Sequence, residues 1–172
     1  MNSINLDIKG WMSEEELLWL HERAKEMSSI VEIGSWMGRS TYALLTGCKG
    51  NVIAVDHFLG NKEEQFMLDL AKDDYVYKEF IKNVGMFDNL IVERNSSLET
   101  ADKYKDKAFD MVFIDGSHLY RAVINDIRAW SPKTLKLICG HDYDFPDVKM
   151  AVGECMKIDG CIGSIWYKYL NV

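Results

Sequence analysis

Short apolar segments alternate with helical ones along this chain, and this alternation constrains the fold more than any other feature of the sequence. The expected strands have apolar interiors and cover residues 30–33, 51–56, 90–93, 109–115 and 135–139. Segments with helical periodicity lie before and between them, at residues 13–28, 38–46, 61–84, 97–105, 120–130 and 148–157. Strands buried on both faces and joined by helical crossovers are typical of parallel sheets. We therefore predict an α/β protein with a Rossmann-like, doubly wound, mostly parallel sheet and helices on both faces.

Three details refine this prediction. Ser13 and Glu16 have the spacing of a capping box, which predicts the start of the first helix. The long helical region at 61–84 is expected to break near Asp73 and Asp74. The aromatic-rich tail at 162–170 is expected to form a closing strand, and it could also form the contact of a homodimer.

Length and charge narrow the class of protein. The chain has 172 residues and only two prolines, which fits a single domain over residues 1–172. Its 20 basic and 27 acidic residues give a net charge of −7, which argues against nucleic acid or an anionic membrane as a partner. There is no apolar run of ~18 residues, the beginning does not resemble a signal peptide, and the four cysteines form no C-x-x-C pair. We therefore expect a cytoplasmic protein.

Residues with chemical potential follow each expected strand at its carboxyl end. In chain order they are Gly34, Asp56, the run at 95–97, Asp115 with Gly116, and His141 with Asp142. Ligands of doubly wound sheets bind outside the carboxyl ends of the strands. The sequence therefore predicts one binding site along this edge of the sheet.

The first of these motifs is the loop Glu-Ile-Gly-Ser-Trp-Met-Gly-Arg-Ser at residues 32–40. Gly34 allows a sharp turn close to a ligand, Gly38 opens the next helix, and Ser40 adds a hydroxyl group. The G-x-x-x-G spacing differs from the G-x-G-x-x-G fingerprint of dinucleotide-binding proteins, which disfavours NAD. The alternative is that both glycines serve only the turn between strand and helix.

Asp56 follows the second expected strand and lies 22 residues after Gly34. An acidic residue at about this distance from the glycine loop accepts hydrogen bonds from the ribose hydroxyls of a nucleotide. Its charge would also repel a 2′-phosphate. The alternative is a solvent-facing aspartate that simply ends a strand.

Asp115 and His118 follow the fourth strand, and Asp142 follows the fifth. Two carboxylates on neighbouring strand ends, with a histidine, are typical of a site for Mg²⁺ or another divalent cation. His118 could instead be a general base. The alternative is a set of polar residues that cap the following helices.

These motifs together resemble the class I S-adenosylmethionine-dependent methyltransferases. The similarity is greatest to the small O-methyltransferase-like group, which includes relatives of macrocin and catechol O-methyltransferases and cephalosporin-hydroxylase-like chains. The residues that carry it are Gly10-Trp11, 31–41, 52–56, 109–120 and 140–143. The E-I-G-x-x-x-G-x-S block combined with the later I-D-G-x-H-x-Y block is its most specific part.

The resemblance implies a role for each matching residue. Gly34, Ser35 and Ser40 would hold the methionine end of S-adenosylmethionine, and Asp56 its ribose. Ser96 and Ser97 fall where the family contacts adenine. The expected cofactor-binding set also includes Glu32, Gly38 and Asp115.

The resemblance also implies a metal site and a catalytic position. Asp115 and Asp142 match the two aspartates of metal-dependent relatives, but Tyr143 stands where those relatives carry Asn or Asp. His118 stands where catechol-type relatives place a catalytic lysine. The expected catalytic residues are therefore His118 and Asp115, and the expected metal ligands are Asp115 and Asp142.

The resulting prediction is O-methylation of a small hydroxylated acceptor, with His118 as base or with help from a divalent cation. Because strands and helices use nearly the whole chain, the acceptor is expected to contact the N-terminal segment, the loop at 57–61 or a partner subunit. Three alternatives remain: a non-catalytic S-adenosylmethionine- or nucleoside-binding protein, a nicotinamide oxidoreductase, and a structural interaction domain.

Overall fold

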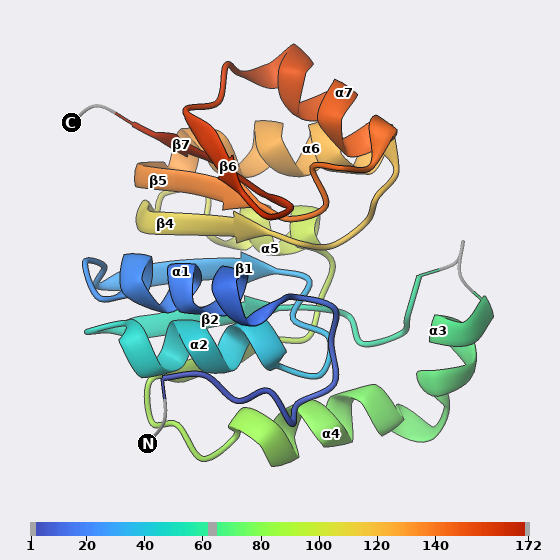
Figure 1. The fold of residues 1–172 in the computed structure, drawn as a ribbon. Helices are drawn as coiled ribbons and strands as arrows, with labels where there is room; N and C mark the ends of the chain where they lie inside the picture. The colour runs from blue at the N-terminus through green and yellow to red at the C-terminus, as the bar shows by residue number, and fades with distance from the viewer. Residues whose placement is uncertain (1–2, 62–64, 171–172) are drawn as a thin grey trace.

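The computed structural model describes residues 3–61 and 65–170, and their strands form one seven-stranded sheet in the order β3-β2-β1-β4-β5-β7-β6 (Figure 1). The strands are β1 (Ser29–Ile33), β2 (Asn51–Val55), β3 (Leu90–Glu93), β4 (Phe109–Ile114), β5 (Thr134–Gly140), β6 (Gly160–Ile162) and β7 (Ile165–Tyr169). Strands β1 to β5 pair in parallel, whereas β7 pairs antiparallel with β5 and β6. The prediction of a mostly parallel, doubly wound sheet is confirmed.

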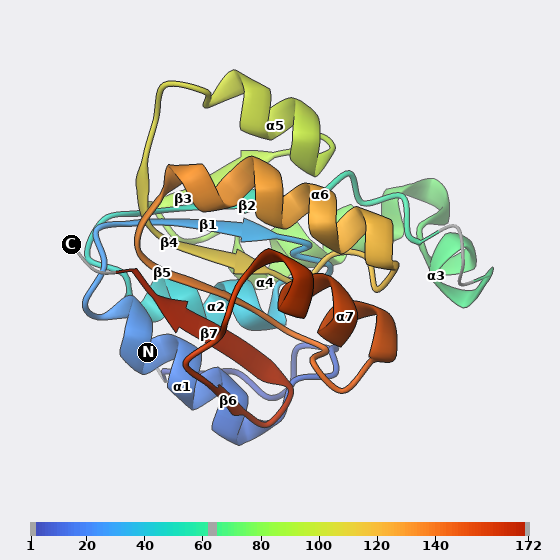
Figure 2. The same cartoon turned by 90° about the horizontal axis from the view of Figure 1, so that it is seen from above.

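Helices cover both faces of the sheet (Figure 2). They are α1 (Glu14–Ala24), α2 (Arg39–Gly47), α3 (Gln65–Leu70), α4 (Tyr75–Val84), α5 (Ser97–Lys103), α6 (Tyr120–Trp130) and α7 (Pro146–Cys155). Helices α1, α2 and α4 pack on one face, and α5, α6 and α7 on the other. Alternate strand residues enter the two cores: Ile30 belongs to the first and Val31 to the second.

The capping box at the start of α1 is present. Ser13 Oγ accepts a hydrogen bond from the backbone amide of Glu16, whose carboxylate accepts one from the amide of Ser13 at 2.7 Å. The predicted break near Asp73 is also present, because a 3-10 turn at Lys72–Asp74 separates α3 from α4. Residues 62–64 of the predicted helical region lie outside the described residues.

The aromatic tail forms strand β7 as expected, and its hairpin partner β6 was not predicted from the sequence. Gly163 turns the chain between them with a φ of 55°. Trp166 is fully buried and Tyr167 packs against Trp19, with ring centroids 5.2 Å apart. The tail therefore completes the core, and the homodimer stays a prediction.

The strand register brings the predicted site residues to one level. Ile33 of β1 pairs with Val55 of β2 and with Ile114 of β4, which in turn pairs with Gly140 of β5. The next residues along the four strands are Gly34, Asp56, Asp115 and His141. The site therefore lies at the carboxyl ends of the strands, on the right of Figure 1.

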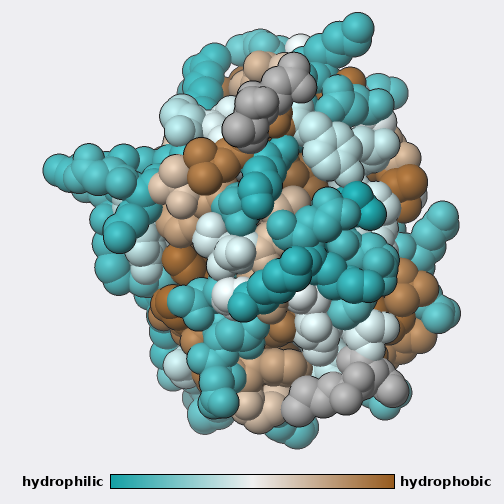
Figure 3. All heavy atoms as spheres, turned by 90° about the vertical axis from the view of Figure 1, so that its left-hand side faces the viewer, coloured by the Kyte–Doolittle hydropathy of each residue, from teal (hydrophilic) through white to brown (hydrophobic). Residues whose placement is uncertain are grey.

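The opposite edge of the sheet, at the amino ends of the strands, is mostly hydrophilic with scattered hydrophobic areas (Figure 3). Within the described ranges, the helices are all too short or too polar to span a membrane.

Candidate active site at the carboxyl ends of the strands

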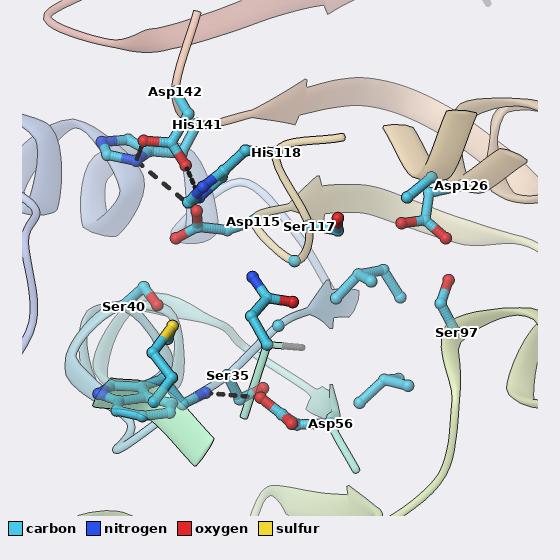
Figure 4. Close-up of a pocket in the computed structure, with 18 of the residues that line it drawn as sticks. Ser35, Ser40, Asp56, Ser97, Asp115, Ser117, His118, Asp126, His141 and Asp142 are labelled. Atoms are coloured by element: carbon cyan, nitrogen blue, oxygen red, sulfur yellow. Dashed lines mark hydrogen bonds and ion pairs between the residues drawn. The ribbon is translucent and has the colours of Figure 1, made fainter. Parts of the chain in front are cut away.

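A cavity of about 810 Å³ opens at the carboxyl ends of the parallel strands (Figure 4). This volume lies in the upper part of the ~300–1,000 Å³ range of small-molecule sites. The predicted site residues that line it are Gly34, Ser35, Ser40, Asp56, Ser96, Ser97, Asp115, His118 and Asp142. Glu32 and Gly38 do not line it. Residues from five strand ends therefore meet around one space, as the sequence predicted.

Gly34 brings the first and fourth strand ends together. Its φ is +86°, and a Cβ at this position would lie 2.1 Å from the backbone oxygen of Asp115. No side chain fits there, because the contact is with backbone that cannot turn away. Gly34 is therefore required for the loop after β1 to touch the loop after β4.

Gly38 has a different reason to be glycine. Its φ is +89°, and an added Cβ would lie 3.1 Å from Val84 and 3.3 Å from Phe80, both on α4. Gly38 thus allows α2 to pack against α4, on the side away from the cavity. The expectation that Gly38 belongs to the ligand-binding wall is not supported by its position.

Glu32 lies beneath the glycine loop and is fully buried. Thr41 donates a hydrogen bond to Glu32 Oε2 at 2.5 Å. Burial raises the pKa of Glu32 to about 7, although hydrogen bonding to hydroxyl groups such as that of Thr41 opposes this rise. Among the described residues, Glu32 Oε1 and Ser35 Oγ are buried polar atoms without a hydrogen-bond partner. Since such atoms are costly to bury, the Ser35 hydroxyl on the cavity wall indicates a place for a ligand.

Asp56 fixes two loops at once. Its Oδ2 accepts a hydrogen bond from the backbone amide of Trp36 at 2.9 Å, and its Oδ1 accepts one from Phe58 at 2.6 Å. Trp36 has a φ of 46°, which side-chain-bearing residues rarely adopt. The Asp56 carboxylate therefore holds a strained loop at the cavity wall, and each oxygen retains a lone pair for another donor.

The third strand end contributes two serines with different partners. Ser96 caps helix α5, and its hydroxyl also donates to Glu99 at 2.5 Å. Ser97 Oγ accepts a hydrogen bond from Trp130 Nε1 at 2.9 Å. Asp126 of α6, which was not predicted from the sequence, lines the same part of the cavity.

A chain of alternating imidazoles and carboxylates forms the opposite wall. His118 Nε2 lies 2.8 Å from Asp142 Oδ2, and Asp142 Oδ1 lies 3.1 Å from His141 Nδ1. His141 Nε2 lies 3.3 Å from Glu16 Oε1, and its Nδ1 lies 3.6 Å from Asp115 Oδ1. Phe145 stacks on the His118 ring with centroids 4.8 Å apart. The predicted catalytic residues His118 and Asp115 are thus in one cluster with Asp142.

Burial and neighbouring charges decide which residues of this cluster carry a proton at neutral pH. Burial would lower the pKa of His141, but the hydrogen bond with Asp142 and the charges of Asp115 and Glu16 outweigh burial and raise it to about 9. Burial would raise the pKa of Asp142, but hydrogen bonds from His118 and His141 hold it below its usual range. Burial raises the pKa of Asp115. At neutral pH the cluster therefore contains a His141 imidazolium beside an ionised Asp142.

The predicted metal ligands Asp115 and Asp142 belong to this cluster, and the structure places His141 beside them. Asp115, His141 and Asp142 each offer a ligand atom, and these atoms lie within 4.8 Å of one another. Mg²⁺ prefers about six oxygen ligands, whereas one of these three groups is an imidazole. Both oxygens of Asp142 also already face His118 and His141. In this arrangement the three residues do not fit Mg²⁺. Binding of another divalent cation stays a prediction.

An N-terminal segment borders the cavity and is held there by Arg39. The Arg39 guanidinium donates to the backbone oxygens of Leu6 at 2.9 Å, Ile8 at 2.7 Å and Met12 at 3.1 Å. The segment at 9–12 lines the cavity, and Trp11 lies against Trp36 with ring centroids 5.8 Å apart. The expectation that the N-terminal segment reaches the site agrees with this placement.

Residues 31–143, about two thirds of the chain, match the model of a family described as a methyltransferase domain. The matched range contains every strand end described above. The chain belongs to this methyltransferase family. The prediction of a methyltransferase is thereby confirmed, and the nicotinamide oxidoreductase and the structural domain are set aside.

Solved structures with the same fold include two O-methyltransferases and a decarboxylase. An O-methyltransferase of Bacillus cereus, solved in complex with SAH, has a TM-score of 0.68 at 14% identity, covering 96% of this methyltransferase and 85% of that chain. TomG of Streptomyces achromogenes, an O-methyltransferase of tomaymycin synthesis solved with SAM, has a TM-score of 0.64 at 12% identity, covering 96% and 83%. A precorrin 8w decarboxylase of Methanobacterium thermoautotrophicum reaches 0.58 at 18% identity, covering 88% and 74%. No curated protein matches the sequence.

Two features of the site were not found from the sequence. His141 was grouped with Asp142, but its contact with Glu16 joins residues 125 positions apart and has no sequence signal. Asp126 did have a sequence signal, because it falls on the apolar face of α6 among Val123, Ile127 and Trp130. A carboxylate at a buried helical position is a marker for a functional group.

Proposed function

We propose that this methyltransferase transfers the methyl group of S-adenosylmethionine to an oxygen atom of a small hydroxylated acceptor. One observation carries the proposal: the His118–Asp142 pair faces the same cavity as the glycine loop and Asp56. Membership of the methyltransferase family and the fold shared with O-methyltransferases support it. The SAH and SAM in those structures support the choice of cofactor.

The glycine loop and Asp56 fit a nucleoside-linked amino acid. Ser35 and Ser40 present hydroxyl groups at one end of the cavity, beside the backbone turn at Gly34. Asp56 lies next along the wall and still has lone pairs for the two ribose hydroxyls. Ser35 Oγ, buried without a partner among the described residues, would gain one from the amino-acid end of the cofactor. Glu32 lies behind this wall, where its Oε2 accepts the hydrogen bond of Thr41.

His118 is the base in this proposal. S-adenosylmethionine supplies a methyl group on a positively charged sulfur, which is a reactive electrophile but needs an oxygen nucleophile. His118 takes the proton of the acceptor hydroxyl as that oxygen bonds to the methyl carbon, and the carbon–sulfur bond breaks to leave SAH. Asp142 orients the His118 ring and stabilises its protonated form, in the manner of other histidine–carboxylate pairs. Stacking on Phe145 restricts the ring further.

His141 and Glu16 maintain the charge on this pair. The His141 imidazolium lies beside Asp142 and is itself held by Glu16, so Asp142 remains ionised when His118 is neutral. Asp115 completes the cluster next to His141. Because imidazoles already neutralise Asp142, the proposal assigns no step to a divalent cation.

The proposed acceptor site lies between the N-terminal segment and the His118 wall. Trp11 and Trp36 form an aromatic surface on one side, and Phe145 lies beside His118. Aromatic side chains with few polar groups suit a small, largely apolar acceptor that carries a hydroxyl group.

Turnover tests the proposal directly. Purified protein incubated with S-adenosylmethionine and a panel of hydroxylated small molecules should form SAH and a product heavier by one methylene unit, detected by mass spectrometry. The rate should be the same with Mg²⁺ and with a chelator. Tight binding of SAH with no product from any acceptor class would favour the non-catalytic binding protein, and loss of all activity on chelation would restore the metal site.

A further inference from the structure

Arg39 is a charged residue at a position where a helix disfavours its charge. It is the first residue of α2, and the free backbone amides at this end make the helix terminus positive. The first turn of α2 is Arg-Ser-Thr-Tyr, which offers no carboxylate to offset the charge. The Arg39 side chain must therefore gain interactions elsewhere that outweigh this repulsion.

Those interactions are with an arch formed by residues 8–12. Ile8 and Met12 are buried in the core and form the two ends of the arch, whereas residues 9–11 between them are exposed. The Arg39 guanidinium donates to the backbone oxygens of both ends, at 2.7 Å from Nη1 to Ile8 and at 3.1 Å from Nε to Met12. Its Nη1 also donates to Leu6, just before the arch. One charged side chain therefore joins the two ends of the arch.

The middle of the arch also packs on Arg39. A Cβ on Gly10 would lie 2.7 Å from Arg39 Cδ and 3.1 Å from Arg39 Cβ, so glycine is needed for the backbone to come this close to the side chain. The hydrogen bonds to the two ends fix the position of this side chain. Arg39 thus shapes the arch at its middle as well as at its ends.

The arch brings Trp11 to the cavity. Residues 9–12 line the cavity, and the Trp11 ring lies against Trp36 with centroids 5.8 Å apart. In Figure 1 this dark blue segment before α1 bends round near the right-hand edge, where the parallel strands end. Trp36 belongs to the glycine loop, and its amide donates to Asp56. The aromatic surface at the proposed acceptor site is therefore built jointly by the arch and the glycine loop.

We propose that Arg39 is a positioning residue for the methyl acceptor: it shapes the arch, and the arch holds Trp11 in the acceptor wall. The inference rests on the proposed function, because it requires an acceptor between the arch and His118. Arg39 acts on the acceptor through the backbone that it holds. Without this support, each acceptor molecule would have to order the arch on binding, which weakens its affinity.

Arg39→Lys tests this role while it keeps the positive charge. A lysine ammonium is a compact charge on a flexible stem and does not reproduce the planar fork that joins both ends of the arch. KM for the acceptor should therefore rise ~10-fold, as expected when a binding segment must be ordered on binding. In contrast, kcat at saturating acceptor should stay within ~3-fold of the wild type, and SAH affinity within ~2-fold. The acceptor is the compound of the hydroxylated panel that the wild type methylates fastest.

Gly10→Ala disturbs the same arch from its other side. The added methyl group would collide with the Arg39 side chain and push the arch away, while the donors of Arg39 remain. KM for the acceptor should rise by a smaller factor, ~3-fold, with kcat and SAH affinity unchanged. In the double variant, KM should rise by less than the product of the two separate factors, because both changes act on one contact. An increase equal to that product would overturn the shared action of Gly10 and Arg39.

Limited proteolysis measures the arch without any acceptor. Trypsin can cleave after Lys9, an exposed residue of the arch, when this segment opens. Both Arg39→Lys and Gly10→Ala should speed the loss of residues 1–9, followed by mass spectrometry, with cleavage after the exposed Lys25 as the internal reference. Equal rates at Lys9 in Arg39→Lys and the wild type would overturn the shaping role of Arg39.

Arg128→Lys is the matched control for both assays. Arg128 does not line the cavity, and it pairs with Glu154 at 3.2 Å on the surface of the protein. This variant should keep the wild-type KM for the acceptor and the wild-type rate of cleavage at Lys9.

The outcomes separate this proposal from the proposed function. If the wild type methylates no compound, the proposed function is wrong, and the acceptor role of Arg39 is wrong with it. If the wild type is active but Arg39→Lys keeps its KM, only the role of Arg39 is overturned. If Arg39→Lys weakens SAH binding as much as it raises KM for the acceptor, Arg39 holds the cofactor instead, and the positioning role is again overturned.

Discussion

The two walls of the cavity are built in different ways. The wall formed by the glycine loop and Asp56 is set by backbone: Gly34 meets the backbone of Asp115, and Asp56 holds the amides of Trp36 and Phe58. The opposite wall is set by side chains that share protons, from His118 through Asp142 to His141. A wall of fixed backbone suits binding, whereas a wall of titratable groups suits proton transfer.

This comparison predicts that the two walls can be disabled separately. Removal of His118 should have the largest effect, because general-base catalysis contributes ~10²–10⁴-fold to rate. His118→Ala should lower kcat by about that factor while SAH affinity, measured by calorimetry, changes less than ~2-fold. Added imidazole should restore part of the rate. A kcat equal to that of the wild type would contradict this separation of the two walls. A loss of SAH affinity as large as the loss of kcat would contradict it too.

Asp56→Ala should have the reverse effect. The variant loses the carboxylate that would accept hydrogen bonds from both ribose hydroxyls. Because hydrogen bonds to a charged group are strong, SAH binding should weaken by ~100-fold or more. The backbone amides of Trp36 and Phe58 also lose their partner, so the loop should become less ordered. Equal SAH affinity in the variant and the wild type would show that the ribose lies elsewhere. Asp88→Ala, which removes an exposed aspartate that does not line the cavity, is the control.

Glu32, which lies beneath the binding wall, should make the free energy of unfolding depend on pH. Its pKa in the folded protein is about 7, above its ordinary value of 4.5, so the folded state holds the proton more tightly. Its contribution to stability is therefore complete below pH 4.5 and is lost as pH rises through 7. Glu32→Gln should reduce the fall in unfolding free energy between pH 5 and 8 by up to about 3 kcal/mol.

Urea unfolding at the two pH values measures this difference. The exposed Glu22→Gln variant should keep the pH dependence of the wild type. If Glu32→Gln also keeps it, Glu32 is ionised in the folded protein throughout this range.

The smallest effect is expected at the mouth of the cavity. Trp11 is 66% exposed and contacts Trp36, so Trp11→Ala should leave stability within ~0.5 kcal/mol of the wild type. Loss of its ring should raise KM for the acceptor by ~5–10-fold, as expected for an aromatic contact of ~1–1.5 kcal/mol, with SAH binding unchanged. An unchanged KM would place the acceptor away from the N-terminal segment.

Much of the site could be predicted because parallel strands end together. Gly34, Asp56 and Asp115 follow three strands with paired registers, so their nearness follows from the strand order alone. The positions of Asp142 and His118 could be predicted for the same reason, because these residues come after β5 and β4. Strand order does not place Glu32 and Gly38: they belong to the same motif as Gly34, but Glu32 lies beneath the wall and Gly38 packs on α4.

The sequence by itself determined the alternation of strands and helices, the parallel sheet, and the set of polar residues at its carboxyl edge. These depend on local periodicity and on the residue after each strand. Only the tertiary structure decided the partners of those residues. The contact of His141 with Glu16, the antiparallel β6–β7 hairpin, and Asp126 facing Gly116 depend on how helices and strands turn against one another. Packing sets those rotations, and it involves the whole chain at once.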